Sequence, residues 1–290
     1  MMAAALSRVM GLFSMSLLAT SCANAPLEQS GALTSYADLE PADGLLAKSK
    51  ILIHKDEVLA ARTVRIVPTI FAAGAQNEGI SDEQRKLVAN AIDRSICFGL
   101  SDRLEVVPAS QPADLTVHAV VTHMDATDEK AVAATKIASV AKSVLLPGIP
   151  VPTPRLPIGL GSLSLEAEAR SADGRPAAVM VWGQGANMLS GSARVSAAGD
   201  AYELASTFGD DFSKMLVTGE NPFKTLSGPP PAERIQSLTG GAPKFAACDV
   251  FGRAPGFNGL VSGIVGAPPE WTDKGGEAAS TPSASTPTAQ

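Results

Sequence analysis

The chain has 290 residues and a formal net charge of −6, and 45% of its residues are hydrophobic while only 4% are aromatic. An acidic chain without a basic cluster lacks the Lys and Arg that displace phosphate counterions, which excludes nucleic acid as a partner. Hydrophobic content of this size supports a core of Ala, Val, Leu and Ile, and the scarcity of aromatics argues against an aromatic-lined sugar groove.

The first 21 residues have the features of a lipoprotein signal peptide. Arg8 is the only charged residue before an apolar run, Val9 to Ala19, that is shorter than the about 20 residues of a membrane-spanning helix. The end of this run, Leu18-Ala19-Thr20-Ser21-Cys22, resembles the lipobox read by lipoprotein signal peptidase, although leucine is commoner where Ala19 stands. We therefore expect cleavage before Cys22 and acylation of its sulfur. An ordinary secretory cleavage site with an incidental Cys22 is the alternative.

Acyl chains on Cys22 would make the membrane the first partner, since each buried CH₂ contributes about 0.8 kcal/mol to anchoring. Neither Ala23 nor Asn24 is the aspartate that marks inner-membrane retention in enteric bacteria. The sequence thus favours an exported protein, lipid-anchored in the cell envelope at the outer membrane and facing the periplasm.

Five pieces follow one another along the chain. They are a signal peptide (1–21), a tether (22–45), an α+β domain (46–217), a Gly/Pro-rich extension (218–273) and a disordered tail (274–290) of Gly, Ala, Ser, Thr and Pro.

The first half of the domain is predicted to hold two strands and a helix. One strand is centred on residues 51–53 within 48–58, and another covers 63–67. The clearest helix begins at Ser81, because Ser81 and Gln84 have the spacing of a capping box. Its apolar face runs from Leu87 to Leu100, and its predicted polar face contains Lys86, Asn90 and Asp93.

The second half is predicted to alternate in the same way. Strands are expected at 104–107 and 115–124, an Ala-rich helix at 128–146, a Pro/Gly-rich loop at 147–161 and an amphipathic helix at 200–216. Residues 162–170 alternate apolar and polar side chains, and Asp173-Gly174 supplies a hairpin turn that leads to a strand at 177–182.

This order predicts an α+β two-layer sandwich, in which a mixed sheet of four to six strands carries helices on one face. The extension after residue 217 is expected to be loose.

Two short motifs behind Cys22 resemble a family of uncharacterised bacterial lipoproteins, the domain of unknown function 3313. They are Ser30-Gly31-Ala32-Leu33 and Tyr36-Ala37-Asp38-Leu39, and Ala113-Asp114-Leu115 and the acidic hairpin are also similar. The resemblance covers roughly Ser30 to Leu216. It implies an envelope lipoprotein and supplies no catalytic residues.

Candidate catalytic and metal-binding residues are few. Of the three histidines, His118 and His123 are expected on opposite faces of one strand and so cannot chelate one metal, while His54 stands apart. No Gly-x-Ser-x-Gly elbow surrounds Ser192 or any other serine. The acidic residues Asp125, Asp128 and Glu129 fit a helix cap better than an acid–base pair or a Ca²⁺ site. We therefore expect no enzyme activity, metal or cofactor.

The sequence favours a non-enzymatic module that binds another envelope protein or has a structural role. A carrier or sensor of a small apolar ligand is the alternative, and an envelope hydrolase is the second. A carrier needs a closed apolar cavity and an enzyme needs converging polar groups, whereas an adaptor should show an apolar patch outside. The loop 145–160 and the segment 251–271 are the candidate contact segments, and the latter is expected mainly to pack on the domain.

With Cys22 acylated, Cys97 and Cys248 remain, and an oxidising compartment favours a disulfide between them. Cys97 is predicted on the polar face of the Ser81 helix, where it is reachable from outside. Cys248 lies in the one short apolar run of the extension, so the bond would pin the extension to that helix. Two free thiols are the alternative.

Overall fold

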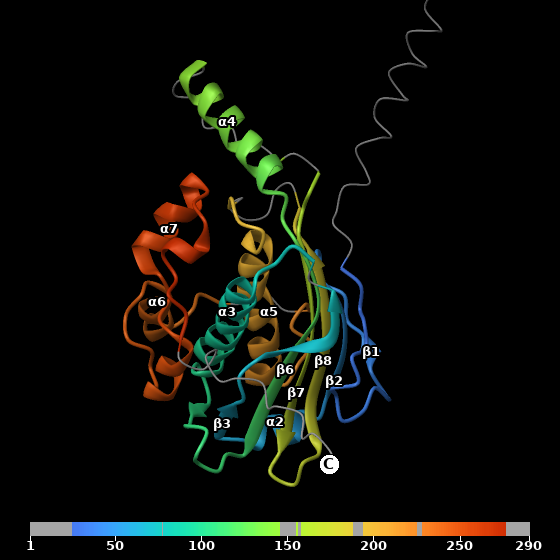
Figure 1. The fold of residues 1–290 in the computed structure, drawn as a ribbon. Coiled ribbons are helices and arrows are strands. Elements are labelled where there is room, and N and C mark those ends of the chain that lie inside the picture. The colour runs from blue at the N-terminus through green and yellow to red at the C-terminus, as the bar shows by residue number, and fades with distance from the viewer. Residues whose placement is uncertain are drawn as a thin grey trace, which may run out of the picture.

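A computed structural model of the chain describes residues 25–76, 78–145, 155, 158–187, 194–224 and 228–276 (Figure 1). The signal peptide, Cys22, most of the Pro-rich loop and the tail beyond 276 lie outside the described residues. Within them, no helix is long and apolar enough to cross a membrane.

The centre of the fold is one mixed sheet of eight strands in the order β1-β2-β8-β7-β6-β3-β5, with β4 also paired to β6. The strands are β1 (Glu40–Pro41), β2 (Lys48–Ile53), β3 (Thr63–Ile66), β4 (Ile70–Gln76), β5 (Glu105–Val106), β6 (Leu115–Asp125), β7 (Ser162–Ser171) and β8 (Pro176–Gly185). From β1 to β6 neighbouring strands are antiparallel, whereas β3 and β4 lie parallel to β6.

The α+β class is confirmed, but the sheet is wider than the predicted four to six strands. The two strands missing from the prediction are β1 and β4. The first has only two residues, and the second is rich in Ala and Gly and shows no polar alternation. The predicted hairpin is present, and Gly174 occupies the left-handed region in its turn with φ of +82°.

Two long helices, α3 (Asp82–Leu100) and α5 (Gly199–Thr218), cover one face of the sheet. The capping box at Ser81 and Gln84 is present and starts α3. The inward residues of β7, such as Leu163 and Leu165, share one core with Trp182, Phe208 and Phe212. The Trp182 and Phe208 rings meet edge to face with centroids 5.5 Å apart.

The remaining helices lie outside this pair. Helix α2 (Lys55–Ala60) follows β2, and α4 (Glu129–Leu145) projects from one end of the molecule (Figure 1). The C-terminal extension, predicted to be loose, forms the helices α6 (Ala232–Leu238) and α7 (Gly256–Val265) and the 3-10 turns η2 (Ala246–Phe251) and η3 (Pro269–Trp271). It packs on the outer side of α3.

The segment predicted as a tether is instead packed on the other face of the sheet from Ala25 onward. Leu33 is buried against Val179 and Val181 of β8, with Tyr36 and Leu39 beside them. We call residues 25–39 the strap. Both faces of the sheet are therefore covered, one by helices and the other by the strap.

Candidate functional site

The predicted disulfide is present, and the Cα atoms of Cys97 and Cys248 are 5.9 Å apart. The reason given for it was partly wrong, because both cysteines are fully buried. The face of α3 that was predicted to be polar and exposed is covered by the extension. Asn90 on the same face is buried for this reason, with Gly275 beside its side chain. Asp93 is buried where the backbone N–H and the hydroxyl of Thr69 donate to its carboxyl group.

A second contact fixes the extension to α3. The guanidinium of Arg94, itself buried, forms an ion pair with Asp273, and the Tyr202 hydroxyl donates a hydrogen bond to the same carboxylate over 2.7 Å. Burial is the largest cause that raises the pKa of Tyr202. The Arg94 guanidinium also reaches the carbonyl of Phe251, so it joins α3 to two points of the extension.

The prediction that His118 and His123 lie on opposite faces of β6 is wrong, because a β-bulge between Val121 and His123 shifts the register by one residue. His118 lies opposite Glu168 and His123 opposite Ser164, so both histidines are on the face of the sheet that the strap covers.

His123 is buried and its Nε2 lies 3.1 Å from Asp125, while its Nδ1 is 3.8 Å from Glu28 of the strap. Burial lowers the pKa of His118. In the described part of the chain, no group of three His, Cys, Asp or Glu side chains could hold a metal ion. Ser192 lies outside the described residues.

The acidic cluster after β6 is placed as a helix cap, in line with the favoured interpretation. Asp128 accepts hydrogen bonds from the backbone N–H groups of Lys130 and Ala131, at 2.8 and 3.1 Å. Asp125 accepts a hydrogen bond from the Ser162 hydroxyl. The cluster thus holds local structure at the start of α4.

The two motifs behind Cys22 hold the strap on the sheet. Ser30 donates through its N–H to Glu166, and the N–H of Thr34 donates to Glu168 over 3.0 Å. The Tyr36 hydroxyl accepts a hydrogen bond from the N–H of Gly31. Glu166 and Glu168, two of the polar residues that alternate with apolar ones along β7, are both buried beneath these contacts.

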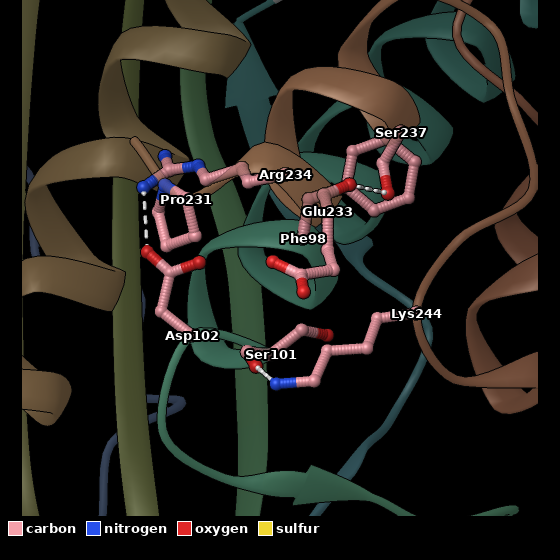
Figure 2. A pocket seen from close by; sticks show the side chains of 8 residues that line it. All are labelled: Phe98, Ser101, Asp102, Pro231, Glu233, Arg234, Ser237 and Lys244. Carbon is pink, nitrogen blue, oxygen red and sulfur yellow. Dashed lines mark hydrogen bonds and ion pairs between the residues drawn. The ribbon is translucent and has the colours of Figure 1, made fainter. Parts of the chain in front are cut away.

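A hollow lies between the C-terminal end of α3 and α6 (Figure 2). It has a volume of about 120 Å³ and is lined by Phe98, Ser101, Asp102, Pro231, Glu233, Arg234, Ser237 and Lys244. Arg234 points across it to Asp102, at 3.2 Å, and the Lys244 ammonium donates to the Ser101 carbonyl over 2.8 Å.

A larger hollow of about 420 Å³ adjoins it. The two share Asp102, Pro231 and Arg234. The larger one is also bounded by Asp210, Val217, Leu238 and the proline run that ends at Pro231. We call the two hollows together the Arg234 groove.

The electrostatics of this groove centre on Arg234, which pairs with Asp102 and also with Asp210. Burial raises the pKa of Asp210, and the Arg234 guanidinium opposes that shift. The Arg234 Nε is buried and has no hydrogen-bond partner within the described residues. The groove therefore combines apolar walls, fixed charges and one unsatisfied hydrogen-bond donor. These features suit the binding of a polypeptide segment, which offers both apolar side chains and carbonyl acceptors.

Sequence reasoning did not find the Arg234 groove, because residues 218–273 were assigned to a loose extension. A local signal was present. Pro231 directly before Ala232 and the acidic Glu233 is typical of a helix start. That signal locates α6 but does not indicate that Arg234 would meet Asp102, which is 132 residues earlier.

A patch of apolar side chains is exposed on α7. Its five large members recur at helical spacing and, with the neighbouring Trp271, are between 43 and 75% exposed: Phe257, Leu260, Val261, Ile264, Val265 and Trp271. We call these six residues the α7 patch. The expectation that segment 251–271 mainly packs on the domain is thus met at Phe251, which is buried, but not along α7.

The chain belongs to the family described as protein of unknown function DUF3313, which matches residues 28–212. The matched range includes both strap motifs, so the resemblance seen in the sequence is confirmed. It ends inside α5, so the extension lies outside it. No curated protein matches the chain.

Solved structures show only distant similarity. The PelC dodecamer from Paraburkholderia phytofirmans is 9% identical with a TM-score of 0.34, over 60% of this chain and 99% of that one. Protein XCC0632 from Xanthomonas campestris, of the family DUF330, is 12% identical with a TM-score of 0.30, over 57% of this chain and 89% of that one.

Proposed function

We propose that the chain is an envelope lipoprotein, held on a membrane by an acylated Cys22, whose domain is a non-enzymatic module that binds another envelope protein in the Arg234 groove. The observation that carries the proposal is the position of this groove. It lies beside Asp102 and Thr218, where α3 and α5 end. Ala25 lies against Gly183, toward the opposite end of β8 and β7.

A groove at that position remains accessible when the other end of the domain is held at a membrane. The pairing of strands supports this geometry. The chain after α3 leads into β5, which pairs with the start of β3, and β3 in turn pairs with the start of β6. The start of β6 pairs with the end of β7, one strand length away from Ser164 and Gly183.

The disulfide supports the exported location. Such bonds persist in oxidising compartments and are rare in the cytosol. The two alternative functions, a carrier and a hydrolase, each need a different kind of site. A carrier needs a closed apolar cavity, whereas both hollows of the Arg234 groove contain charged side chains, among them Asp102 and Arg234. A hydrolase needs a nucleophile beside a base, and that role would have to fall on residues without a recognised motif.

Site-specific photocrosslinking in intact cells tests the groove. A photoreactive amino acid in place of Leu238, which lines the groove, should give one discrete protein adduct. The same amino acid in place of exposed Lys50 on β2 is the control and should not. Arg234→Ala should remove the Leu238 adduct while abundance and the disulfide are unchanged. Equal adducts at both positions, or none at Leu238, would contradict the proposal.

The anchor is tested separately. Cys22→Ala should leave the protein unprocessed or free in the periplasm, and wild-type protein should carry acyl mass on its N-terminal cysteine. A mature wild-type protein that lacks this mass and washes off membranes would refute the lipoprotein assignment and leave the groove experiment to be judged by itself.

A further inference from the structure

We propose that the α7 patch rests on the lipid bilayer, in its headgroup region, as a second membrane contact beside the acyl anchor. This inference rests on the proposed acylation of Cys22, which fixes the end of the domain that faces the membrane. Three independent features lead to it: the short link to the anchor, the place of α7 in the fold and the chemistry of its exposed face.

The link between anchor and domain is short because the strap is packed rather than free. The Ala25 carbonyl oxygen lies against Gly183, close to the Ser164 hydroxyl. Only three peptide units separate Ala25 from Cys22. A fully extended chain covers about 11 Å over that length. A lipid on Cys22 therefore holds the end of the domain that contains Ala25 directly against the membrane.

Helices α4 and α7 lie at that same end (Figure 1). Asp125, at the end of β6, pairs with Ser162 at the start of β7, and α4 begins four residues later. The Lys136 ammonium of α4 donates to the Ile264 carbonyl of α7 over 2.9 Å. The N–H of Val195, in the chain that leads into α5, donates to the Gly266 carbonyl at the end of α7.

The orientation of α7 is fixed by contacts on its buried face. The small residues Gly259, Ser262 and Gly263 are its buried ones. Arg194 donates to the Gly259 carbonyl and to the Ser262 hydroxyl, at 3.3 and 3.2 Å. With the small face held inward, the large apolar side chains are directed outward. This is the reverse of the usual order in a surface helix, whose apolar face is turned to the core.

The chemistry of the exposed face suits a bilayer. No residue of α7 is charged, so its insertion removes no ion from water. Trp271 beside it belongs to the residue type that is enriched at membrane interfaces. On α4, next to Lys136, Ile137 adds another exposed apolar side chain. After Glu129, the charged residues in the sequence of α4 are all lysines, and Lys130 and Lys136 among them match anionic headgroups.

Trp271 provides a direct reporter, because the only other tryptophan, Trp182, is fully buried. The full mature chain with Cys22→Ala is mixed with vesicles of phosphatidylethanolamine and phosphatidylglycerol, so that no acyl chain contributes to binding. We expect the Trp271 emission to shift to shorter wavelength and to be quenched by brominated lipid. The Phe257→Ser/Ile264→Ser variant should bind these vesicles at least about tenfold more weakly, because it removes two large apolar side chains whose burial in the bilayer favours binding.

The matched control is Leu59→Ser/Ile235→Ser, which removes two exposed apolar side chains on α2 and α6 and should bind as the parent does. Emission that vesicles leave unchanged would overturn the proposal. So would shielding of Trp271 at high protein concentration without vesicles, together with a dimeric mass, because the occupant would then be a second copy. Binding of a purified apolar peptide, but not of vesicles, would also overturn it. None of these outcomes depends on whether Cys22 is acylated in cells.

Discussion

The Ser30 backbone N–H donates a hydrogen bond over 3.2 Å to the carboxyl group of Glu166, a residue that lies 136 positions later and is fully buried. The Ser30 hydroxyl reaches the other oxygen of the same carboxyl group. The strap thus covers this carboxyl group and also supplies its hydrogen-bond donors.

Ser30→Ala should loosen the strap. Removal of the hydroxyl leaves a buried carboxyl oxygen without its donor, which costs about 1–3 kcal/mol. We expect a lower free energy of unfolding in urea and faster proteolytic cleavage between residues 25 and 39. Ser35→Ala is the matched control, because the Ser35 hydroxyl only accepts a local bond from the N–H of Ala37 at an exposed site. Equal proteolysis of the two variants would show that the Glu166 contact does not hold the strap.

Loss of the disulfide should destabilise the domain. The bond closes a loop of 151 residues, for which the chain-entropy relation gives about 5 kcal/mol. We expect Cys97→Ala/Cys248→Ala to lower the urea midpoint and to expose α6 and η2 to hydrogen exchange before α5. Mass spectrometry of protein from the periplasm should find both thiols oxidised in the wild type. Two free thiols there would refute the bond in the cell.

Stability should fall as the pH rises toward neutrality, because of Asp93. Burial raises the pKa of Asp93 to about 7, although Thr69 donates to its carboxyl group. An acid whose pKa is higher in the folded state binds protons more tightly there. Its share of stability is therefore present below the unfolded pKa of about 4 and is lost as the pH rises through 7. Over that window the loss is on the order of 4 kcal/mol.

Asp93→Asn should remove most of this dependence and should raise the free energy of unfolding at pH 8, because the amide oxygen still accepts from Thr69 without carrying a charge. Urea unfolding at pH 5 and pH 8 measures both effects. Burial also raises the pKa of Asp211 to about 6, so a smaller slope should remain in this variant. An unchanged slope would mean that Asp93 does not titrate in this range.

Gly209→Ala should destabilise the protein even though alanine favours helices. Helices α3 and α5 cross closely here, and a Cβ on Gly209 would collide with the side chain of Ser95 and lie 3.0 Å from the Ile96 nitrogen. We expect a net loss of about 1–3 kcal/mol, as for other overpacked cores. Gly228→Ala, where the added methyl meets nothing within 4 Å, should be neutral. Thermal melts of the two variants give the comparison.

The sequence predicted the local features well and the long-range ones poorly. The Ser81 capping box and the turn at Gly174 were predictable because their partners lie within a few residues. The burial of Asp93 was not, because its polar side chain suited an exposed helix face and its partner Thr69 lies 24 residues earlier, between β3 and β4. Likewise, Glu166 alternates as an outward residue would, and the strap that buries it lies 136 positions away.

In the candidate site, too, one feature could be predicted from the sequence and others could not. The Cys97–Cys248 bond could be predicted by elimination, since only two cysteines remain after Cys22. The Arg234 groove could not, because it requires α6, the end of α3 and the end of α5 to meet. The outward direction of the α7 patch is set by Arg194, which the sequence places more than 60 residues away.

The strap also constrains the order in which the protein can assemble. A chain that emerges with its N-terminus first, from a ribosome or through a membrane channel, presents residues 25–39 long before the β7–β8 hairpin exists to receive them. Cys97 must wait 151 positions for its partner. Contacts of such sequence separation are slow to close. The strap thus appears early but is among the last segments to reach its place in the fold. Until then, its apolar side chains need shielding by something other than this chain.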